Sequence, residues 1–409
     1  RAALATLAAT RAAQTKLADE AKEIMVMREL PTPKTAYILQ RGEYDHRGAA
    51  VGPDTPGALP PFPADQPRNR LGLARWLTDP RHPLLARVTV NRFWQSLFGL
   101  GLVKTSDDFG SQGDRAEYPE LLDWLAGEFI RSGWDVKALH KTIVLSQTYR
   151  QRSFATPEIM ADDPENVWLA RGPRHRLPAE MIRDQALAAS GLLVEKIGGP
   201  PVYTYDIPES FKPAPAGKGE ALYRRSVYTF WRRTGPAPML EAFDVPKRVV
   251  CVARRDTTNT SLQALVLLNG PQFVEAARVL AQRVTKEQST DEARLARAFA
   301  LVLGREPSGK EPALIAKMLA NQRAVYTADA KAAEALLVIG ESKRDPMLPL
   351  AEHAALTATC LALYNLWTND DLFTTLKARQ VVHRFKQNAL HNGTQSASSS
   401  LSFNSLFGY

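Results

Sequence analysis

The chain has 409 residues, of which 44% are hydrophobic and 23% charged. This composition is typical of a globular protein with two or three domains, and no run of about 18 apolar residues suggests a membrane-spanning helix. A formal net charge of +9 favours anionic partners. With only two cysteines, Cys251 and Cys360, a disulfide-rich scaffold and a zinc cluster of Cys pairs are excluded. The two are expected to be buried thiols, with one disulfide between them as the alternative.

The N-terminal part is predicted to contain little tertiary structure. Residues 1–30 form an Ala-rich helical pattern without an initiator Met or a signal-peptide core, so we expect a helical remnant of an upstream domain. Pro31 and Pro33 end this helix because proline cannot continue it. Residues 31–68 are predicted to contain a short strand at 36–39, followed by a linker arm rich in proline and glycine.

A main helical domain is predicted over residues 69–290. Apolar residues at helical spacing indicate helices at 70–78, 83–98, 119–131 and 135–150, and four tryptophans in this stretch mark a core (Trp76, Trp94, Trp124 and Trp134). Further helices are expected at 178–194, 262–268 and 274–284. The alternation of aromatic and polar residues in RRSVYTFWRRT predicts a strand at 226–231, paired with a segment at 249–253.

The remaining residues are predicted to form a C-terminal helical subdomain over 291–366 and a Ser/Asn-rich, disordered tail over 367–409. The expected fold class is therefore mainly α. It has a multi-helix, bundle-like core, a small β element and extended Pro/Gly-rich connections.

Basic residues concentrate in one short segment. Between positions 224 and 255 there are eight Lys or Arg residues and two acidic ones. Arginine binds carboxylate or phosphate through a planar fork of donors, so several converging arginines would form an anion-binding pocket. The simpler interpretation is that they form structural salt bridges with Glu180, Asp184, Glu241, Asp244 and Asp256. The predicted anion-binding set, called here the arginine set, comprises Arg224, Arg225, Arg232, Arg233, Arg254 and Arg255.

Other candidate site residues lie near the arginine set. Tyr228, Phe230 and Trp231 could stack on a base or a sugar, and Asn259 could support a ligand, although a buried Asn is more simply explained by structural hydrogen bonds. His140 is a weak candidate for a catalytic acid or base, and a structural histidine is the simpler interpretation. The common hydrolase, metalloprotease, nucleotide-binding and dinucleotide-binding motifs are missing. No metal site is predicted.

Several long motifs in one order resemble a known family. LARWLTDPRHPLLARVTVNRFWQSLFGLGLVKTSDDFGSQG, RLPAEMIRDQALAASGLL, RRSVYTFWRRTGPAPMLEAFDVP and RRDTTNTSLQALVLLN are similar to the planctomycete-specific domain of unknown function, PSD type. That domain is found at the C-terminus of proteins that carry cytochrome-c-like and PSCyt domains. The chain departs from the family after about residue 366, which puts the origin of its last thirty or so residues in doubt.

The resemblance implies an extracytoplasmic protein, in the periplasm or at the cell surface, whose partner is a cytochrome-c-like domain of the same or a neighbouring chain. No cofactor is expected in this chain, and any haem would belong to an upstream domain. The favoured hypothesis is a non-catalytic docking or binding module that binds an anionic polymer through the arginine set. The alternatives are an enzyme acting on a sulfated or acidic polysaccharide, with Arg225, Arg233 and Arg255 holding the anion beside His140, and, less favoured, a nucleic-acid-binding protein.

Overall fold

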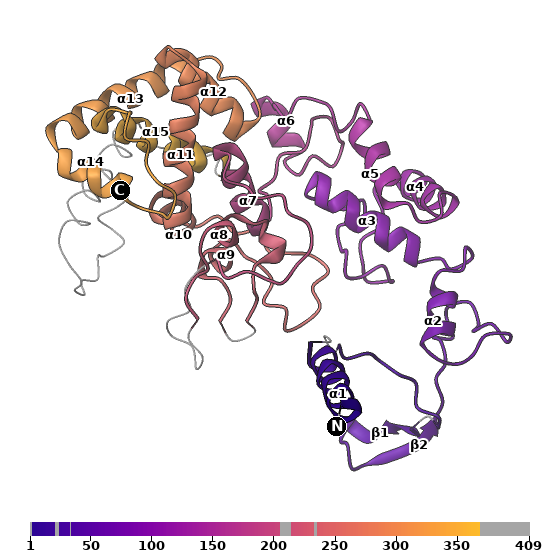
Figure 1. Cartoon of the computed structure of the whole chain (residues 1–409). Coiled ribbons are helices and arrows are strands. Elements are labelled where there is room, and N and C mark those ends of the chain that lie inside the picture. Colours follow the sequence, from indigo (N-terminus) through magenta and orange to yellow (C-terminus); the bar gives the residue numbers. More distant parts are fainter. Residues whose placement is uncertain (1, 21–23, 33, 205–213, 233–234, 369–409) are drawn as a thin grey trace. The chain divides into compact units, whose positions relative to one another are not determined.

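The computed structural model describes residues 2–20, 24–32, 34–204, 214–232 and 235–368 (Figure 1). Over these residues the chain is mainly helical and its one ladder-paired sheet is a two-stranded hairpin, which confirms the predicted fold class. The described chain separates into two compact units. One contains Arg1–Asn91 and Tyr118–Thr142, and the other contains Arg92–Glu117 and Ile143–Tyr409.

The first unit begins with a helix that buries none of its residues and continues into the hairpin. Its elements are α1 (Ala2–Glu20), β1 (Ala36–Leu39), the 3-10 turn η1 (Gln40–Gly42), β2 (Arg47–Val51), α2 (Arg70–Leu77), α4 (Pro119–Arg131), the first half of α3 (Leu85–Phe98) and most of α5 (Val136–Leu145). The strand predicted at 36–39 is confirmed. It pairs with β2 in antiparallel register, with Ala36 opposite Val51.

The first unit has a small core to which the proline-rich arm is attached. Trp76, Leu125 and Phe129 are buried in it. The Trp76 indole donates a hydrogen bond of 2.9 Å to the carbonyl of Pro60. At Gly72 an added Cβ would lie 1.9 Å from the Pro67 carbonyl oxygen, so only glycine permits this approach of the arm to α2.

The second unit contains the larger core. Its elements are the rest of α3 and α5, followed by α6 (Pro157–Asp162), α7 (Ala179–Ser190), α8 (Glu220–Tyr223), the 3-10 turn η2 (Ser226–Tyr228), α9 (Pro238–Ala242), α10 (Ser261–Asn269), α11 (Pro271–Glu287), α12 (Asp291–Leu303), α13 (Glu311–Ala328), α14 (Ala330–Leu337) and α15 (Leu350–Thr368).

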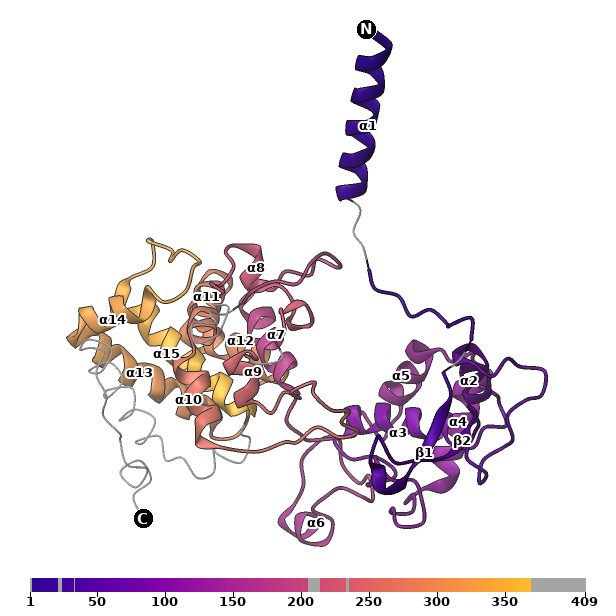
Figure 2. The same ribbon diagram turned by 90° about the horizontal axis from the view of Figure 1, so that it is seen from below.

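Helix α15 packs against α11, α12, α13 and α14 (Figures 1 and 2). It is buried around its circumference, including the fully buried Ala354, Ala358 and Leu361, which is the pattern of a central helix. Its buried Thr357 and Thr359 donate to carbonyls four residues earlier, so neither hydroxyl is left without a partner. Helix α11 contributes Leu280 and Val284 to the same core, which also includes Phe299 of α12.

The predicted helices are present, but some end earlier than expected. Helix α5 ends at Leu145 rather than near 150, because Ser146 bonds back to the Ile143 carbonyl and accepts from the Tyr149 backbone. Helix α7 ends at Ser190 rather than 194, because Gly191 adopts the left-handed conformation that terminates a helix. The predicted tail lies outside the described residues from position 369, and the predicted domain boundaries stay predictions.

The strand predicted at 226–231 is wrong. Residues 226–228 form the 3-10 turn η2, and nearby backbone pairing consists of isolated bridges, such as Val202 with Thr229. Residues 249–253 were predicted to pair with this strand, but they lie in a loop and form no described backbone bridge with it. Alternation failed as a guide because long-range polar contacts bend this segment. The disulfide alternative is also wrong, since Cys251 is an exposed thiol and Cys360 a buried one.

Candidate anion-binding site

Arg224 points inward and is bound by the protein's own backbone. Its guanidinium donates to the carbonyls of Lys196 at 2.8 Å, Gly198 at 2.5 Å and Pro200 at 3.3 Å, and the residue is only 5% exposed. Three carbonyls therefore occupy donors that an external anion would need. Arg224 stabilises the loop before α8 and is not positioned to bind a ligand.

A second buried arginine explains why the chain turns at this point. Arg183 of α7 donates to the carbonyls of Arg224 and Leu222 and to the Ser226 hydroxyl. Burial lowers the pKa of Arg183 to about 10, and nearby Asp184 opposes this effect. Arg183 is not among the candidates predicted from the sequence, although a basic side chain beside Ile182 on an otherwise apolar helix face was the available signal.

Arg225 and Arg255 are each close to a carboxylate. Arg225 lies 3.6 Å from Asp184, whose other oxygen accepts from the Ser226 amide and hydroxyl at 2.7 Å each. Arg255 donates to Glu180 at 2.6 Å. These are two of the salt-bridge partners expected under the simpler interpretation.

The other members of the arginine set differ in their exposure. Arg232 is half-buried with its guanidinium 6.0 Å from the Phe230 ring centre. Arg254 is exposed and, among the described residues, has neither an ion pair nor a hydrogen bond. Arg233 lies outside the described residues. The described members of the set therefore differ in their partners and in their exposure.

Side chains of the protein itself occupy the aromatic rings proposed for stacking. Arg224 lies 3.9 Å from the ring centre of Tyr228, and Arg248 lies 4.6 Å from that of Trp231. Phe230 packs against Tyr203 with ring centres 4.7 Å apart. Because guanidinium groups stack favourably on aromatic faces, these contacts stabilise the local fold, and each leaves at most one face of its ring for a ligand.

A loop closed at its base carries most of the exposed basic residues described between positions 224 and 255. Residues 245–257 are called here the basic loop; Val245 is still buried in the core, and the loop closes at Thr258. The Asp244 carboxylate accepts from the Thr258 backbone amide at 2.8 Å and from its hydroxyl at 2.9 Å. Arg176 also donates to Asp244 at 2.5 Å and to the Thr258 carbonyl. One carboxylate and one arginine therefore hold both ends of the loop together.

The charge on Asp244 is needed for this closure. Burial alone would raise the pKa of Asp244, but the hydrogen bonds from Thr258 and Arg176 outweigh it and hold the pKa below its ordinary value. Asp244 also has a φ of 60°, in the left-handed region that Asp tolerates better than most residues. The base of the loop is therefore ordered by specific polar contacts.

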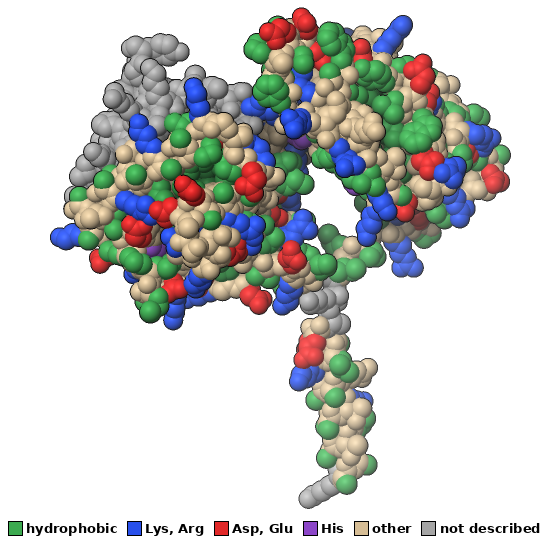
Figure 3. All heavy atoms as spheres, turned by 90° about the horizontal axis from the view of Figure 1, so that it is seen from above, with side chains coloured by type: hydrophobic (Ala, Val, Ile, Leu, Met, Phe, Trp, Pro, Cys, Tyr) green, Lys and Arg blue, Asp and Glu red, His purple; other side chains and the backbone are tan. Residues whose placement is uncertain are grey.

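The tip of the basic loop displays positive charge and apolar side chains together. Lys247, Arg248, Arg254 and Arg255 are all exposed. Between the two basic pairs, Val249, Val250 and Val252 are 51%, 75% and 45% exposed. On the face shown in Figure 3, basic, acidic and hydrophobic side chains are interspersed, so in that view the positive charge does not form one broad basic face. The loop tip is the strongest candidate site in the described residues.

Two further candidates lie outside the basic loop in the sequence. Asn259 is exposed beside Thr258 and makes no described hydrogen bond. His140 is half-buried in α5 and belongs to the first compact unit, whereas the described arginines belong to the second.

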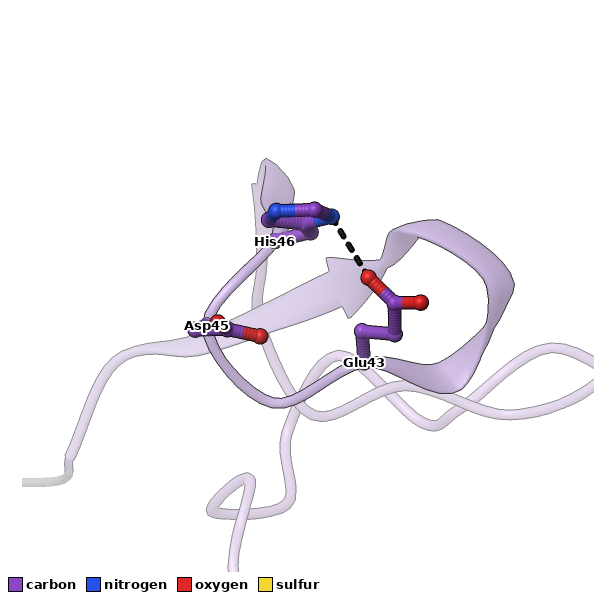
Figure 4. Close-up of side chains that lie close together, drawn as sticks. All are labelled: Glu43, Asp45 and His46. Atoms are coloured by element: carbon purple, nitrogen blue, oxygen red, sulfur yellow. Dashed lines mark ion pairs between the residues drawn. The ribbon is translucent and has the colours of Figure 1, made fainter.

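Three metal-ligating side chains meet in the turn after β1 (Figure 4). The ligand atoms of Glu43, Asp45 and His46 lie within 4.8 Å of one another, and His46 Nδ1 lies 2.6 Å from Glu43 Oε2. Imidazole and carboxylate are ligands for divalent transition metals, but all three residues are exposed. These three residues were not predicted as a group from the sequence, where the spacing Glu-x-Asp-His was the available signal.

A cavity of about 190 Å³ lies between helices of the second unit, beside Asp291, Arg323, Glu352 and His353. Arg323 bonds to both carboxylates, Asp291 at 2.6 Å and Glu352 at 2.7 Å. The charges that line this cavity are thus largely neutralised by one another. Buried His353 donates from Nε2 to the Arg278 carbonyl, 3.1 Å away.

The part of the chain that holds the arginine contacts and the basic loop is similar to a known family. Residues 69–319 match the family PSD1, described as a protein of unknown function (DUF1553). The chain belongs to this family. The PSD1 match includes the basic loop, α7 and the carbonyl contacts of Arg224, and it ends in α13. No curated protein and no solved structure matches the chain, and no described helix combines the length and apolar character needed to cross a bilayer.

Proposed function

We propose that this PSD1 chain is a non-catalytic binding module of a larger extracytoplasmic protein, and that its basic loop binds an anionic polymer such as an acidic polysaccharide. The family resemblance supports a cytochrome-c-like domain of the same or a neighbouring chain as its docking partner, to which any haem would belong. The single observation that carries the anion-binding proposal is the tip of the basic loop, where exposed Lys247 and Arg254 have no described ion pair.

The geometry narrows the predicted arginine set. Arg224 is bound by carbonyls, and Arg225 and Arg255 each face a carboxylate. Lys247, Arg248 and Arg254 remain as cations that an external ligand can reach. The polysaccharide-cleaving alternative requires Arg225, Arg233 and Arg255 around one cleft with His140, and no observation on the described residues favours that arrangement.

Binding to dextran sulfate across a salt series tests this proposal. A polyanion that contacts basic side chains releases counterions, so the affinity should fall steeply as salt rises. Because a surface charge contributes up to about 1 kcal/mol, the double variant Lys247→Glu/Arg254→Glu should bind about tenfold more weakly.

The matched control is Lys317→Glu/Lys331→Glu, which reverses two exposed charges on α13 and α14 and should bind like the wild type. Equal affinities for the two double variants, or binding that does not depend on salt, would refute the proposal.

A further inference from the structure

The basic loop has an apolar component that anion binding does not explain. Val249, Val250 and Val252 fall within four consecutive positions of the loop tip and are 45–75% exposed. Exposed apolar clusters of this kind mark surfaces that contact a protein or a lipid. A soluble polyanion offers sulfate or carboxylate groups but little apolar surface, so it would leave the valines in water.

We infer that the tip of the basic loop is a membrane-surface anchor, in which the valines enter the headgroup region of an anionic lipid bilayer while the flanking basic residues contact its phosphates. This inference rests on the proposed anion binding and extends it from a soluble polyanion to the phosphates of a lipid surface. The occupant is a lipid surface because the loop presents one apolar segment between two basic pairs, Lys247-Arg248 before it and Arg254-Arg255 after it. A bilayer offers the matching arrangement, with phosphates above the acyl boundary.

The fold fixes the two ends of the loop that carries this tip. Asp244 and Arg176 tie the two ends of the loop at Thr258. At the start of the tip, the Arg248 guanidinium stacks on Trp231 at 4.6 Å. Because the ends are already fixed, less conformational entropy is lost when the tip binds. Valine adds little further cost, since its branched side chain has few rotamers to lose.

The two cysteines make the insertion directly measurable. Cys251 is exposed at the loop tip between Val250 and Val252, whereas Cys360 is fully buried in α15, and burial raises the pKa of its thiol to about 12. A thiol-reactive, environment-sensitive fluorophore therefore labels Cys251 in the folded chain. Its emission should shift to the blue, and the protein should co-sediment, with vesicles of about one third phosphatidylglycerol in phosphatidylcholine. Vesicles of phosphatidylcholine alone should produce neither effect, and sedimentation of unlabelled chain checks that the dye does not drive binding.

Two variants separate this inference from the proposed function. Val249→Ser/Val250→Ser/Val252→Ser keeps every charge, so it should retain dextran sulfate binding but lose at least about tenfold in vesicle affinity. Lys247→Glu/Arg254→Glu should lose both. The control for general surface hydrophobicity is Val338→Ser/Met347→Ser, which changes two side chains that are 76% and 86% exposed outside the loop.

The outcomes assign each failure to one proposal. If the dye stays in water with anionic vesicles, or if the triple serine variant binds them like the wild type, the membrane inference is overturned. Such a result, together with intact dextran sulfate binding, would assign the loop to a soluble anion or an acidic protein surface. If Lys247→Glu/Arg254→Glu binds dextran sulfate as tightly as the wild type, the proposed function itself is overturned.

Discussion

At the residue scale, the role of each ionisable side chain is decided by what surrounds it. Arg224 and Arg254 have the same chemistry, but three carbonyls bind the first and the second is exposed to water. A buried charge must be paired or hydrogen-bonded to be tolerated. For this reason a count of arginines in the sequence overestimated the number available to a ligand.

His353 illustrates the same point for a neutral side chain. It is buried between α15 and α11 with Nε2 at the Arg278 carbonyl. Burial lowers the pKa of His353 to about 4. The hydrogen bond to Arg278 and the charge of Asp345 oppose this effect, whereas the cationic charges of Arg278 and Arg344 add to it.

This depressed pKa predicts that stability falls with acidification. Between pH 6.5, the ordinary value, and about 4, the unfolded chain binds a proton at His353 that the folded chain does not. The contribution of neutral His353 to the free energy of unfolding is therefore fully present above about pH 6.5. It is lost as the pH falls towards 4, which lowers that free energy by up to about 3 kcal/mol. Urea unfolding across this range measures it.

His353→Gln should flatten this part of the stability profile, because glutamine keeps a donor for the Arg278 carbonyl but does not titrate. Parallel profiles for the wild type and His353→Gln would show that this residue is not the source.

At the element scale, polar contacts between distant residues shape the segments around the candidate site. Arg183 holds carbonyls about forty positions away at the start of η2, and Asp244 closes a loop at Thr258. The local alternation of residues predicted a strand at 226–231, but the contacts of Arg183 accompany the turn η2 at this place. Helix α10 was easier to predict, because Thr260 and Gln263 form a capping box within four residues.

Closure of the basic loop can be tested by removing its central carboxylate. In Asp244→Ala both ends of the loop lose their shared acceptor, so the loop should open and trypsin should cleave after Arg248 or Arg254 several-fold faster than in the wild type. Limited proteolysis with mass spectrometry identifies the sites.

Asp256→Ala is the matched control. It removes a carboxylate from the same loop, and this carboxylate takes part in no described hydrogen bond or ion pair. Unchanged cleavage in Asp244→Ala would mean that the loop is held by other contacts.

At the scale of the whole molecule, stability comes from the two helical cores and not from the N-terminal helix. Helix α1 buries none of its residues, whereas Leu280 of α11 is fully buried in the core around α15. The chain therefore contains a long helical segment that adds no described core contact.

Deletion of residues 1–20 should consequently shift the thermal unfolding midpoint by less than about 2 °C. Leu280→Ala should instead lower the free energy of unfolding by roughly 2–5 kcal/mol, since it leaves a cavity in a packed core. Differential scanning calorimetry and urea unfolding compare the two. A large drop of the unfolding midpoint on deletion of residues 1–20 would contradict this prediction and show that α1 makes stabilising contacts.

The sequence by itself determined the mainly α fold, most helix positions, the strand at 36–39 and the concentration of basic charge between 224 and 255. These features follow from periodicity, capping residues, proline and composition, all of which act over a few neighbouring residues. Only the tertiary structure decided that Arg224 turns inward, that residues 226–228 form a 3-10 turn and that the basic loop is closed by Asp244. Each of these depends on contacts between residues far apart in the chain, and only the folded core brings those residues together.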